Sequence, residues 1–315
     1  MGVKAKKPES RGWSGRFKEQ YNRTRPVLQC LMLGLLAACA QASELKPGTA
    51  AAFERYIRAT EAQRTADLGN GVALVIDGLP DPARKEAYAK LHQGELYIEP
   101  LHSKEDGHRI PIHDGLVHHW VGTIFIPGAR LSEVLVVLQN YDNQQNVYKP
   151  YVRRSKLVGH NGNEYRIYLQ LFQKSIATVV INANFDVHYA MPGPTQAVSQ
   201  SYSTRIAEVE NPDKPNEHEL PVGNDHGYLW RLDSYWNIEE KDGGAYVQVE
   251  SIALTRSIPP LVAWLVNPLV RSIPRSVLSN LLTATREAVR EANPRTTAPT
   301  PTFAHNSLHI SEQSR

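Results

Sequence analysis

The feature that most limits the fold of this chain is a series of strand-like segments separated by hairpin turns. Two of these turns contain Asn161-Gly162 and Asp242-Gly243, dipeptides that readily adopt the positive backbone angles of tight hairpins. Six or seven such strands followed by one terminal helix predict an antiparallel α+β fold, and not a Rossmann-type sheet. The predicted strands cover residues 116–126, 152–159, 165–174, 178–190, 196–209, 227–239 and 245–255.

The last strand leads through Ile258-Pro259-Pro260 into an apolar stretch that ends at Asn267-Pro268. A continuous helix is predicted only from Arg275 to Arg290, because Pro268 and Pro274 are expected to break its entry into short turns. This junction resembles the carboxyl-terminal half of StAR-related lipid-transfer (START) domains and of their polyketide-cyclase and coenzyme-Q-binding relatives. The passage from Ile124 to Ser155, with a strand, a short helical segment and a proline before the second strand, is similar to the opening of those domains.

The resemblance extends from Leu116 to Ala292 and implies a helix-grip fold. In that fold a curved antiparallel sheet of six to seven strands wraps around a long carboxyl-terminal helix, and an apolar molecule lies between them. The implied function is binding or transport of a hydrophobic small molecule, such as a lipid, an isoprenoid or a polyketide-like compound. Two alternatives stay open: a cyclase or aromatase that uses the same cavity, and a structural protein of the cell envelope. No cofactor is implied, and no catalytic residue is assigned.

Residues 228–238 alternate between an apolar face and a more polar face, as a half-buried strand does. By the same parity, the apolar side chains of 165–171 are expected to point toward the same space. The charged residues Arg231, Asp233 and Glu250 are interpreted as a polar anchor for the ligand. The alternative is that the aromatic residues only fill a core and that the charged residues face water. The predicted ligand-binding residues are Tyr165, Ile167, Leu169, Tyr202, Trp230, Arg231, Leu232, Asp233, Trp236, Glu250 and Trp264.

The amino-terminal segment has the pattern of an export signal. A basic region precedes an apolar run from Val27 to Leu36, and Ala40-Gln41-Ala42 fits cleavage before Ser43. The sequence therefore predicts a signal peptide over residues 1–42 and a periplasmic or secreted protein. Cys39 follows Leu36-Ala-Ala and fits a lipoprotein site as well, which gives a membrane-anchored alternative.

Charge and cysteine content exclude several classes of site. Eight of the 35 Lys and Arg residues precede Val27, but only two of the 32 Asp and Glu do, so the rest of the chain is slightly acidic and predicts no nucleic-acid partner. The two cysteines, Cys30 and Cys39, both lie in the predicted leader, which excludes disulfides and thiol chemistry from the remainder. No metal site is predicted, because His113, His118 and His119 lack a recognised ligand spacing.

Residues 43–113 are predicted to form an extension that packs on the START-like domain of residues 114–293. The extension is expected to contain a helix over 50–66 with Thr49 as its N-cap, a strand at Val72–Asp77, and a second helix over 82–93. Edge strands are expected at 96–101 and 109–112. Residues 294–315 are predicted to be a disordered tail. The apolar stretch Leu261–Val270 is predicted to form a lid or to touch a membrane surface. The protein is predicted to be a monomer.

Overall fold

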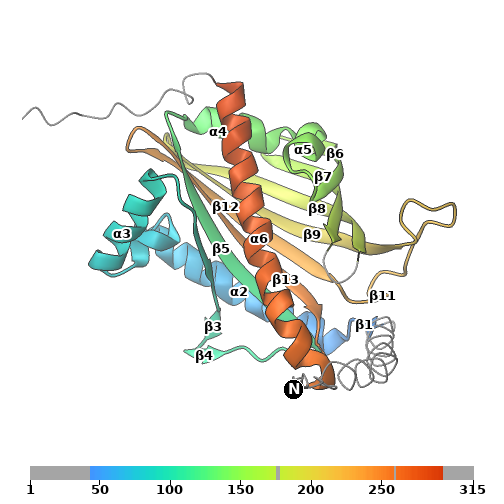
Figure 1. The fold of residues 1–315 in the computed structure, drawn as a ribbon. Helices are drawn as coiled ribbons and strands as arrows, with labels where there is room; N and C mark the ends of the chain where they lie inside the picture. The colour runs from blue at the N-terminus through green and yellow to red at the C-terminus, as the bar shows by residue number, and fades with distance from the viewer. Residues whose placement is uncertain (1–42, 175–177, 259, 294–315) are drawn as a thin grey trace, which may run out of the picture.

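One large antiparallel sheet dominates the structure, a computed structural model that describes residues 43–174, 178–258 and 260–293 (Figure 1). Eight strands follow one another across it in the order β2-β5-β13-β12-β9-β8-β7-β6, and β10 pairs with β9 off this path. The predicted signal peptide and the predicted tail lie outside the described residues. The seven long strands match the seven predicted from the sequence, with bounds β5 Gly115–Pro127, β6 Val152–Asn161, β7 Glu164–Lys174, β8 Thr178–Gly193, β9 Gln196–Glu210, β12 Arg231–Lys241 and β13 Gly244–Arg256.

The carboxyl-terminal helix α6 (Pro260–Ala292) crosses one face of the sheet, as Figure 1 shows, and its side chains are described from Ser272 onward. The prediction of a broken entry is wrong, because the helix continues through both Pro268 and Pro274. A proline removes one helical hydrogen bond and crowds the preceding turn, but a long helix packed on a sheet tolerates that cost locally. A curved antiparallel sheet with a long helix across it is the predicted helix-grip arrangement.

The contact between α6 and β5 depends on a glycine. A Cβ atom at Gly122 would lie only 2.7 Å from Cδ1 of Leu282, so a larger residue there requires the Leu282 side chain or the helix to shift. The surrounding core contains Leu278 and Leu282 of α6, Ile124 of β5, and Val134 of the short helix α4 (Leu131–Gln139). Two further short elements, η2 (Tyr141–Asn143) and α5 (Gln144–Val147), lead from α4 to β6.

The opposite face of the sheet is covered by the amino-terminal extension. Its long helix α2 (Pro47–Gly69) passes behind the sheet in Figure 1 and packs Phe53, Tyr56 and Ile57 against Tyr235 and Ile252. The helix α3 (Asp81–His92) lies against the end of β5 and β13. The strand β2 (Tyr97–Pro100) joins the edge of the main sheet beside β5. The extension thus forms a third layer, and its apolar side chains pack in the same clusters as those of the sheet.

Several details of the extension differ from expectation. Residues Val75–Gly78 form a 3-10 helix (η1) instead of a strand, because the carboxylate of Asp77 turns back to accept the backbone N–H of Leu74. The N-cap of α2 is Lys46, while Thr49 lies inside the helix and donates its hydroxyl to the carbonyl of His113. The remaining short strands are β1 (Ser43–Glu44), β3 (Lys104–Glu105), β4 (His108–Arg109), β10 (His218–Glu219) and β11 (Asn224–Asp225).

Candidate functional site

The candidate site is the sheet face that lies toward α6, called here the helix-facing side. Trp236 and Ile238 of β12 belong to the same apolar cluster as Leu278 and Leu282 of α6, which fixes the even-numbered residues of β12 on this side. Neighbouring strands follow from the pairing register. Leu232, Ser234, Trp236 and Ile238 therefore point toward the helix, and Asp233, Tyr235 and Asn237 point away from it.

A row of serines crosses the middle of the helix-facing side. Ser234 of β12 is the direct register partner of Ser201 on β9 and of Ser251 on β13. Ser199 and Ala253 occupy neighbouring positions on the same side. A closely packed layer between a sheet and a helix is normally filled by large apolar side chains. Serine instead occupies this level on three adjacent strands, and its small side chain fills less volume than the usual apolar one.

Larger apolar side chains surround the serine row and are only partly buried. Leu232 and Trp236 flank Ser234 on β12, and Trp120 is the register partner of Ser251. Leu169 and Leu171 of β7 also stay partly exposed, although they pack against buried residues such as Ile167 and Ile181. An apolar floor that solvent still reaches, under a helix, is a surface that an apolar ligand can cover.

Five of the predicted ligand-binding residues lie on this side. Tyr165, Ile167 and Leu169 share the apolar cluster that also contains Leu232, and Trp236 packs nearer to α6. The serine row was not predicted. Its signal was available in the sequence, because serine recurs at every second residue over 199–203 of β9.

The remaining predicted residues lie elsewhere, and the expected alternation fails at Trp230. This residue precedes the regular part of β12, so its indole turns to the opposite face and packs in the cluster with Phe53 and Tyr56 of α2, while Leu229 takes the helix-facing position. The polar residues Arg231, Asp233, Glu250 and Tyr202 also occupy positions on the α2 side of the sheet, which does not agree with a role as anchors between sheet and helix. The side chain of Trp264 lies outside the described residues.

Polar groups at the edge of the helix-facing side carry no formal charge at neutral pH. His118 lies two residues before Trp120 on β5, and burial lowers the pKa of its imidazole to about 4. Its Nε2 lies 3.1 Å from the hydroxyl of Thr255. Tyr141 and Tyr189 contact each other through their hydroxyls at 2.9 Å, and burial raises the pKa of Tyr189 to about 12. Hydroxyls and a neutral imidazole suit an uncharged, weakly polar ligand.

A buried polar chain fills the other side of the sheet, beneath α2. The hydroxyl of Tyr56 accepts the backbone N–H of Ser103 at 2.9 Å, so its own proton is free to bond Nδ1 of His119 at 3.0 Å. His119 then donates through Nε2 to Glu250 at 2.7 Å. The second carboxylate oxygen of Glu250 accepts Arg64 from α2, which also donates to the side-chain oxygen of Asn237 at 2.7 Å. Every member has a partner, so this chain docks α2 on the sheet.

A second acid of α2 extends this docking contact. Glu61 accepts the hydroxyls of Tyr202 at 2.6 Å and of Tyr235 at 3.0 Å. Asp233 lies nearby, and burial raises the pKa of its carboxyl to about 6. Tyr202, predicted to be a ligand contact, is therefore bound by the extension, while Asp233 accepts the backbone N–H of Ser203 at 3.2 Å.

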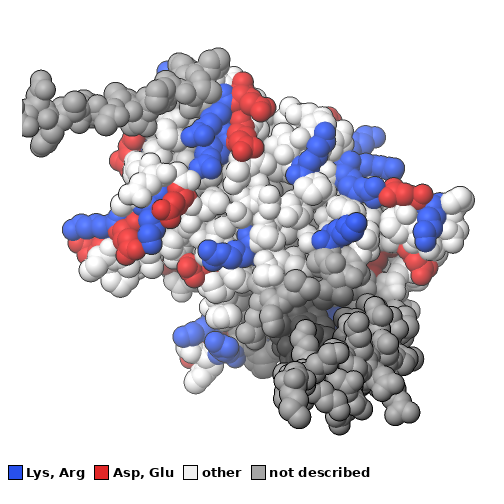
Figure 2. Space-filling model, in the orientation of Figure 1, with Lys and Arg blue, Asp and Glu red and all other residues white. Residues whose placement is uncertain are grey.

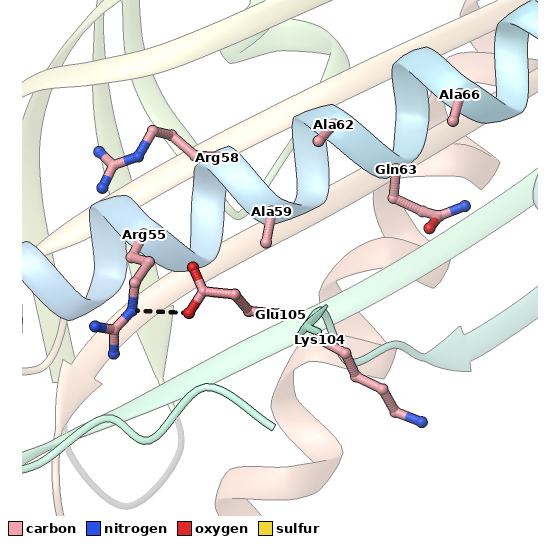
Figure 3. Close-up of a pocket in the computed structure, with 8 residues that line it drawn as sticks. All are labelled: Arg55, Arg58, Ala59, Ala62, Gln63, Ala66, Lys104 and Glu105. Atoms are coloured by element: carbon pink, nitrogen blue, oxygen red, sulfur yellow. Dashed lines mark ion pairs between the residues drawn. The ribbon is translucent and has the colours of Figure 1, made fainter. Parts of the chain in front are cut away.

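A shallow groove of about 530 Å³ runs between α2 and the β3–β4 hairpin. Figure 3 shows Ala59, Ala62 and Ala66 along its helical side, with Arg55 reaching across to Glu105 at 3.5 Å. Both partners of this ion pair are about half exposed, and exposed pairs contribute little binding energy. The groove is open to solvent, and charged side chains such as Arg55 and Glu105 border its alanine-lined wall.

Metal and membrane signatures were searched over the same described part of the chain. Within residues 43–174, 178–258 and 260–293, no group of three or more His, Cys, Asp or Glu side chains is placed to hold a metal ion. Over those residues, none of the helices combines the length and apolar character that crossing a bilayer requires.

Comparison with known proteins gives similarity in structure but not in sequence. No protein-family model matches the chain, and no curated protein matches it. Among solved structures, the chain is similar to a STAR-related lipid transfer protein from Xanthomonas axonopodis, with 18% identity, a TM-score of 0.40, and coverage of 61% of this chain and 98% of that one.

Two further solved structures show the same kind of likeness. Human STARD10 is 11% identical with a TM-score of 0.40, over 69% of this chain and 84% of that chain. The Zhui aromatase/cyclase from Streptomyces sp. R1128 is 12% identical with a TM-score of 0.34, over 58% of this chain and 97% of that chain.

Proposed function

We propose that this protein binds a hydrophobic small molecule between the helix-facing side of its sheet and α6. The observation that carries the proposal is the serine row Ser201, Ser234 and Ser251, which replaces bulky core residues beneath the helix. The partly exposed Leu232 and Trp236 beside it supply the apolar surface. A carrier role fits this arrangement, because the floor offers shape and apolar area but few groups that fix one orientation.

The energy of such binding comes mainly from apolar burial. Covering exposed apolar surface gains about 25 cal/mol per Å², so a lipid-sized molecule needs no dense polar site to bind. The hydroxyls of the serine row can form one or two hydrogen bonds with a weakly polar group of the ligand. A lipid, isoprenoid or polyketide-like compound has this chemistry.

The test is to fill the proposed space with a larger side chain. Leu232→Trp is expected to abolish displacement of a fluorescent fatty-acid probe while the melting temperature changes little, because an empty volume accepts the ring. In a closed core the same enlargement would cost about 1–3 kcal/mol and lower the melting temperature. Val158→Trp is the matched control, since Val158 is 55% exposed on β6 and lies outside the proposed space. Unchanged probe binding by Leu232→Trp would contradict the proposal.

The ligand can be identified by its mass. Native mass spectrometry of protein purified from its own cell envelope would show an added mass if an apolar molecule travels with it. Recovery of two related masses, one a dehydrated or cyclised product of the other, would favour an enzyme over a carrier.

We also propose that the protein works outside the cytoplasm, after removal of residues 1–42. The support is the sequence pattern of a basic region, an apolar run and Ala40-Gln41-Ala42. Amino-terminal sequencing of the protein from its source is expected to begin at Ser43. A chain that begins at a lipidated Cys39 would indicate a membrane-anchored protein instead.

A further inference from the structure

The segment that would become the new amino terminus is already built into the fold. Ser43 and Glu44 form β1, which pairs in antiparallel register with β11 so that Ser43 faces Asp225. Leu45 donates its backbone N–H to Gly223 at 2.7 Å, one hydrogen-bonded pair farther along the same ladder. Because such pairs alternate along an antiparallel ladder, Ser43 and Asp225 form a hydrogen-bonded pair as well. The backbone nitrogen of Ser43 is therefore held next to Asp225.

The side chain of Asp225 has one satisfied oxygen and one unsatisfied oxygen. Oδ1 accepts the backbone N–H of Gly227 at 2.7 Å and the indole N–H of Trp230 at 3.0 Å. Among the described residues, Oδ2 has no hydrogen-bond partner although it is buried, and the whole residue is only 1% exposed. A buried carboxylate oxygen without a donor is destabilising, because nothing compensates for the water that it has lost.

A second buried carboxylate makes this environment more negative. Glu208 of β9 is 3% exposed and accepts the backbone N–H groups of His226 and Tyr228 together with Nδ1 of His226 at 2.9 Å. Burial, and then the nearby charge of Asp225, raise the pKa of Glu208, while burial raises the pKa of Asp225. The two acids together favour a cation at this end of the sheet.

We propose that the α-ammonium group of Ser43, formed when the chain is cut after Ala42, binds Oδ2 of Asp225 and locks the mature amino terminus onto β11. A signal peptidase would hydrolyse the Ala42–Ser43 peptide bond with water, which leaves a carboxylate on Ala42 and an amine on Ser43 that takes up a proton. Before the cut, the Ser43 nitrogen is a neutral amide with a single N–H, which the ladder uses. After the cut it is a cation with additional donors for the orphaned oxygen.

Removal of the leader would thus complete the fold. Asp225 holds the indole of Trp230, and Trp230 packs against α2 at the beginning of β12. A new ion pair at Asp225 would tighten the segment that leads into the strand carrying Leu232 and Ser234. The inference rests on the proposed cleavage before Ser43 and not on the proposed ligand, because it concerns only the amino terminus and its docking site.

The test compares two recombinant chains that differ by one residue. One begins at Ser43 and the other at Ala42, and both are released from a cleavable fusion so that each has a free amine. In the Ser43 chain, the pKa of the α-amino group, followed by nitrogen-15 NMR, is expected to rise at least one unit above its ordinary value of about 7.7–8.0, a tenfold change in proton affinity. The Ala42 amine, displaced by one residue, is expected to titrate with an ordinary pKa.

The substitution Asp225→Asn keeps an acceptor for Gly227 and Trp230 and removes the charge. In the Ser43 chain it is expected to return the amine to its ordinary pKa and to lower the melting temperature by at least about 2–4 °C more than in the Ala42 chain. If the variant does not fold, the comparison of the two unsubstituted chains decides alone. An ordinary amine pKa in the unsubstituted Ser43 chain would overturn the proposal.

The pH dependence of stability gives an independent reading. A raised pKa in the folded state means stabilisation that is complete below about pH 7.7 and is lost as the pH rises through the folded value, so the advantage of the Ser43 chain over the Ala42 chain should disappear between about pH 8 and 10. The other charged or titratable groups around this site, Glu44, Glu208, His226, Tyr228 and Arg256, are common to both chains and cancel in the comparison. An advantage that persists unchanged above pH 10 would contradict the ion pair.

Discussion

The imidazole Nε2 of His119 on β5 lies 2.7 Å from Oε1 of Glu250 on the neighbouring strand β13. Both side chains are buried, on the side of the sheet that the amino-terminal helix covers. Arg64 of that helix completes the pair, so Glu250 connects two strands and the extension through a single carboxylate. The sequence suggested Glu250 as a ligand anchor, whereas the structure uses it to join layers.

The first prediction concerns this carboxylate. Glu250→Gln removes the charge that faces the buried guanidinium of Arg64, and breaking a buried ion pair typically costs about 3–5 kcal/mol. Urea unfolding at pH 7 is the measurement. Glu99→Gln is the control, because Glu99 is an exposed residue of the edge strand β2, and it should change the free energy of unfolding by less than about 0.5 kcal/mol. A loss below 1 kcal/mol for Glu250→Gln would mean that the pair does not secure α2.

The second prediction is the pH dependence of the same contact. Burial raises the pKa of Glu250, but the hydrogen bond from His119 and the charge of Arg64 outweigh it, so the pKa lies below its ordinary value. A lowered folded-state pKa stabilises the protein above the unfolded value of about 4.3, and this stabilisation is lost as the pH falls through the folded value. The protection factors of the α2 amides, which correct for the intrinsic exchange rate at each pH, should therefore fall on acidification below about pH 4.3, and less so in Glu250→Gln.

The third prediction concerns His118 at the edge of the helix-facing side. Because burial lowers its pKa to about 4, the unfolded chain binds a proton at a higher pH than the folded protein does. Stability should fall as the pH decreases from about 6.5 to 4, and His118→Gln should remove at most about 3 kcal/mol of that fall. His108→Gln, at an exposed position of β4, is the control for thermal melts across this range. Identical slopes for the two variants would contradict a buried neutral His118.

The fourth prediction tests the approach of α6 to the sheet. Gly122→Val places methyl groups where Cδ1 of Leu282 already lies, so the buried Leu282 side chain or α6 must shift, at a cost of about 1–3 kcal/mol. Gly193→Val is the matched control, because a Cβ atom at Gly193 meets nothing within 4 Å. Thermal melting and probe binding should both change for Gly122→Val. Equal behaviour of the two variants would mean that the helix is not held against β5 at this point.

The fifth prediction comes from the sequence of the apolar stretch Leu261–Val270, whose side chains lie outside the described residues. We propose that it contacts a membrane surface during ligand exchange, as a short apolar segment can. Trp264→Asp should reduce sedimentation with phosphatidylcholine vesicles and leave the circular dichroism spectrum unchanged. Global unfolding of this variant would show Trp264 to be a core residue, and the proposed contact would then be abandoned.

The long strands of the sheet and the helix across it could be predicted from the sequence. Their signals are local: Asn161-Gly162 and Asp242-Gly243 specify hairpins, and alternation along each segment specifies a strand. The path of the chain through Pro268 and Pro274 could not be predicted in this way. Local propensity there favours a break, whereas the helix continues to Ala292 and packs Leu278 and Leu282 against the sheet. Tertiary context of this kind overrides local propensity.

The sequence by itself determined the antiparallel helix-grip architecture and the alternation of apolar side chains along its strands, because periodicity and turn residues act over a few neighbours. Only the tertiary structure decided on which face of the sheet each polar side chain lies and which residues it contacts. Trp230 lies just before β12 and packs against α2, and Glu250 is bound by His119 and Arg64 from distant parts of the chain. A one-residue change of parity moves a side chain to the opposite face of a sheet, and long-range pairing sets that parity.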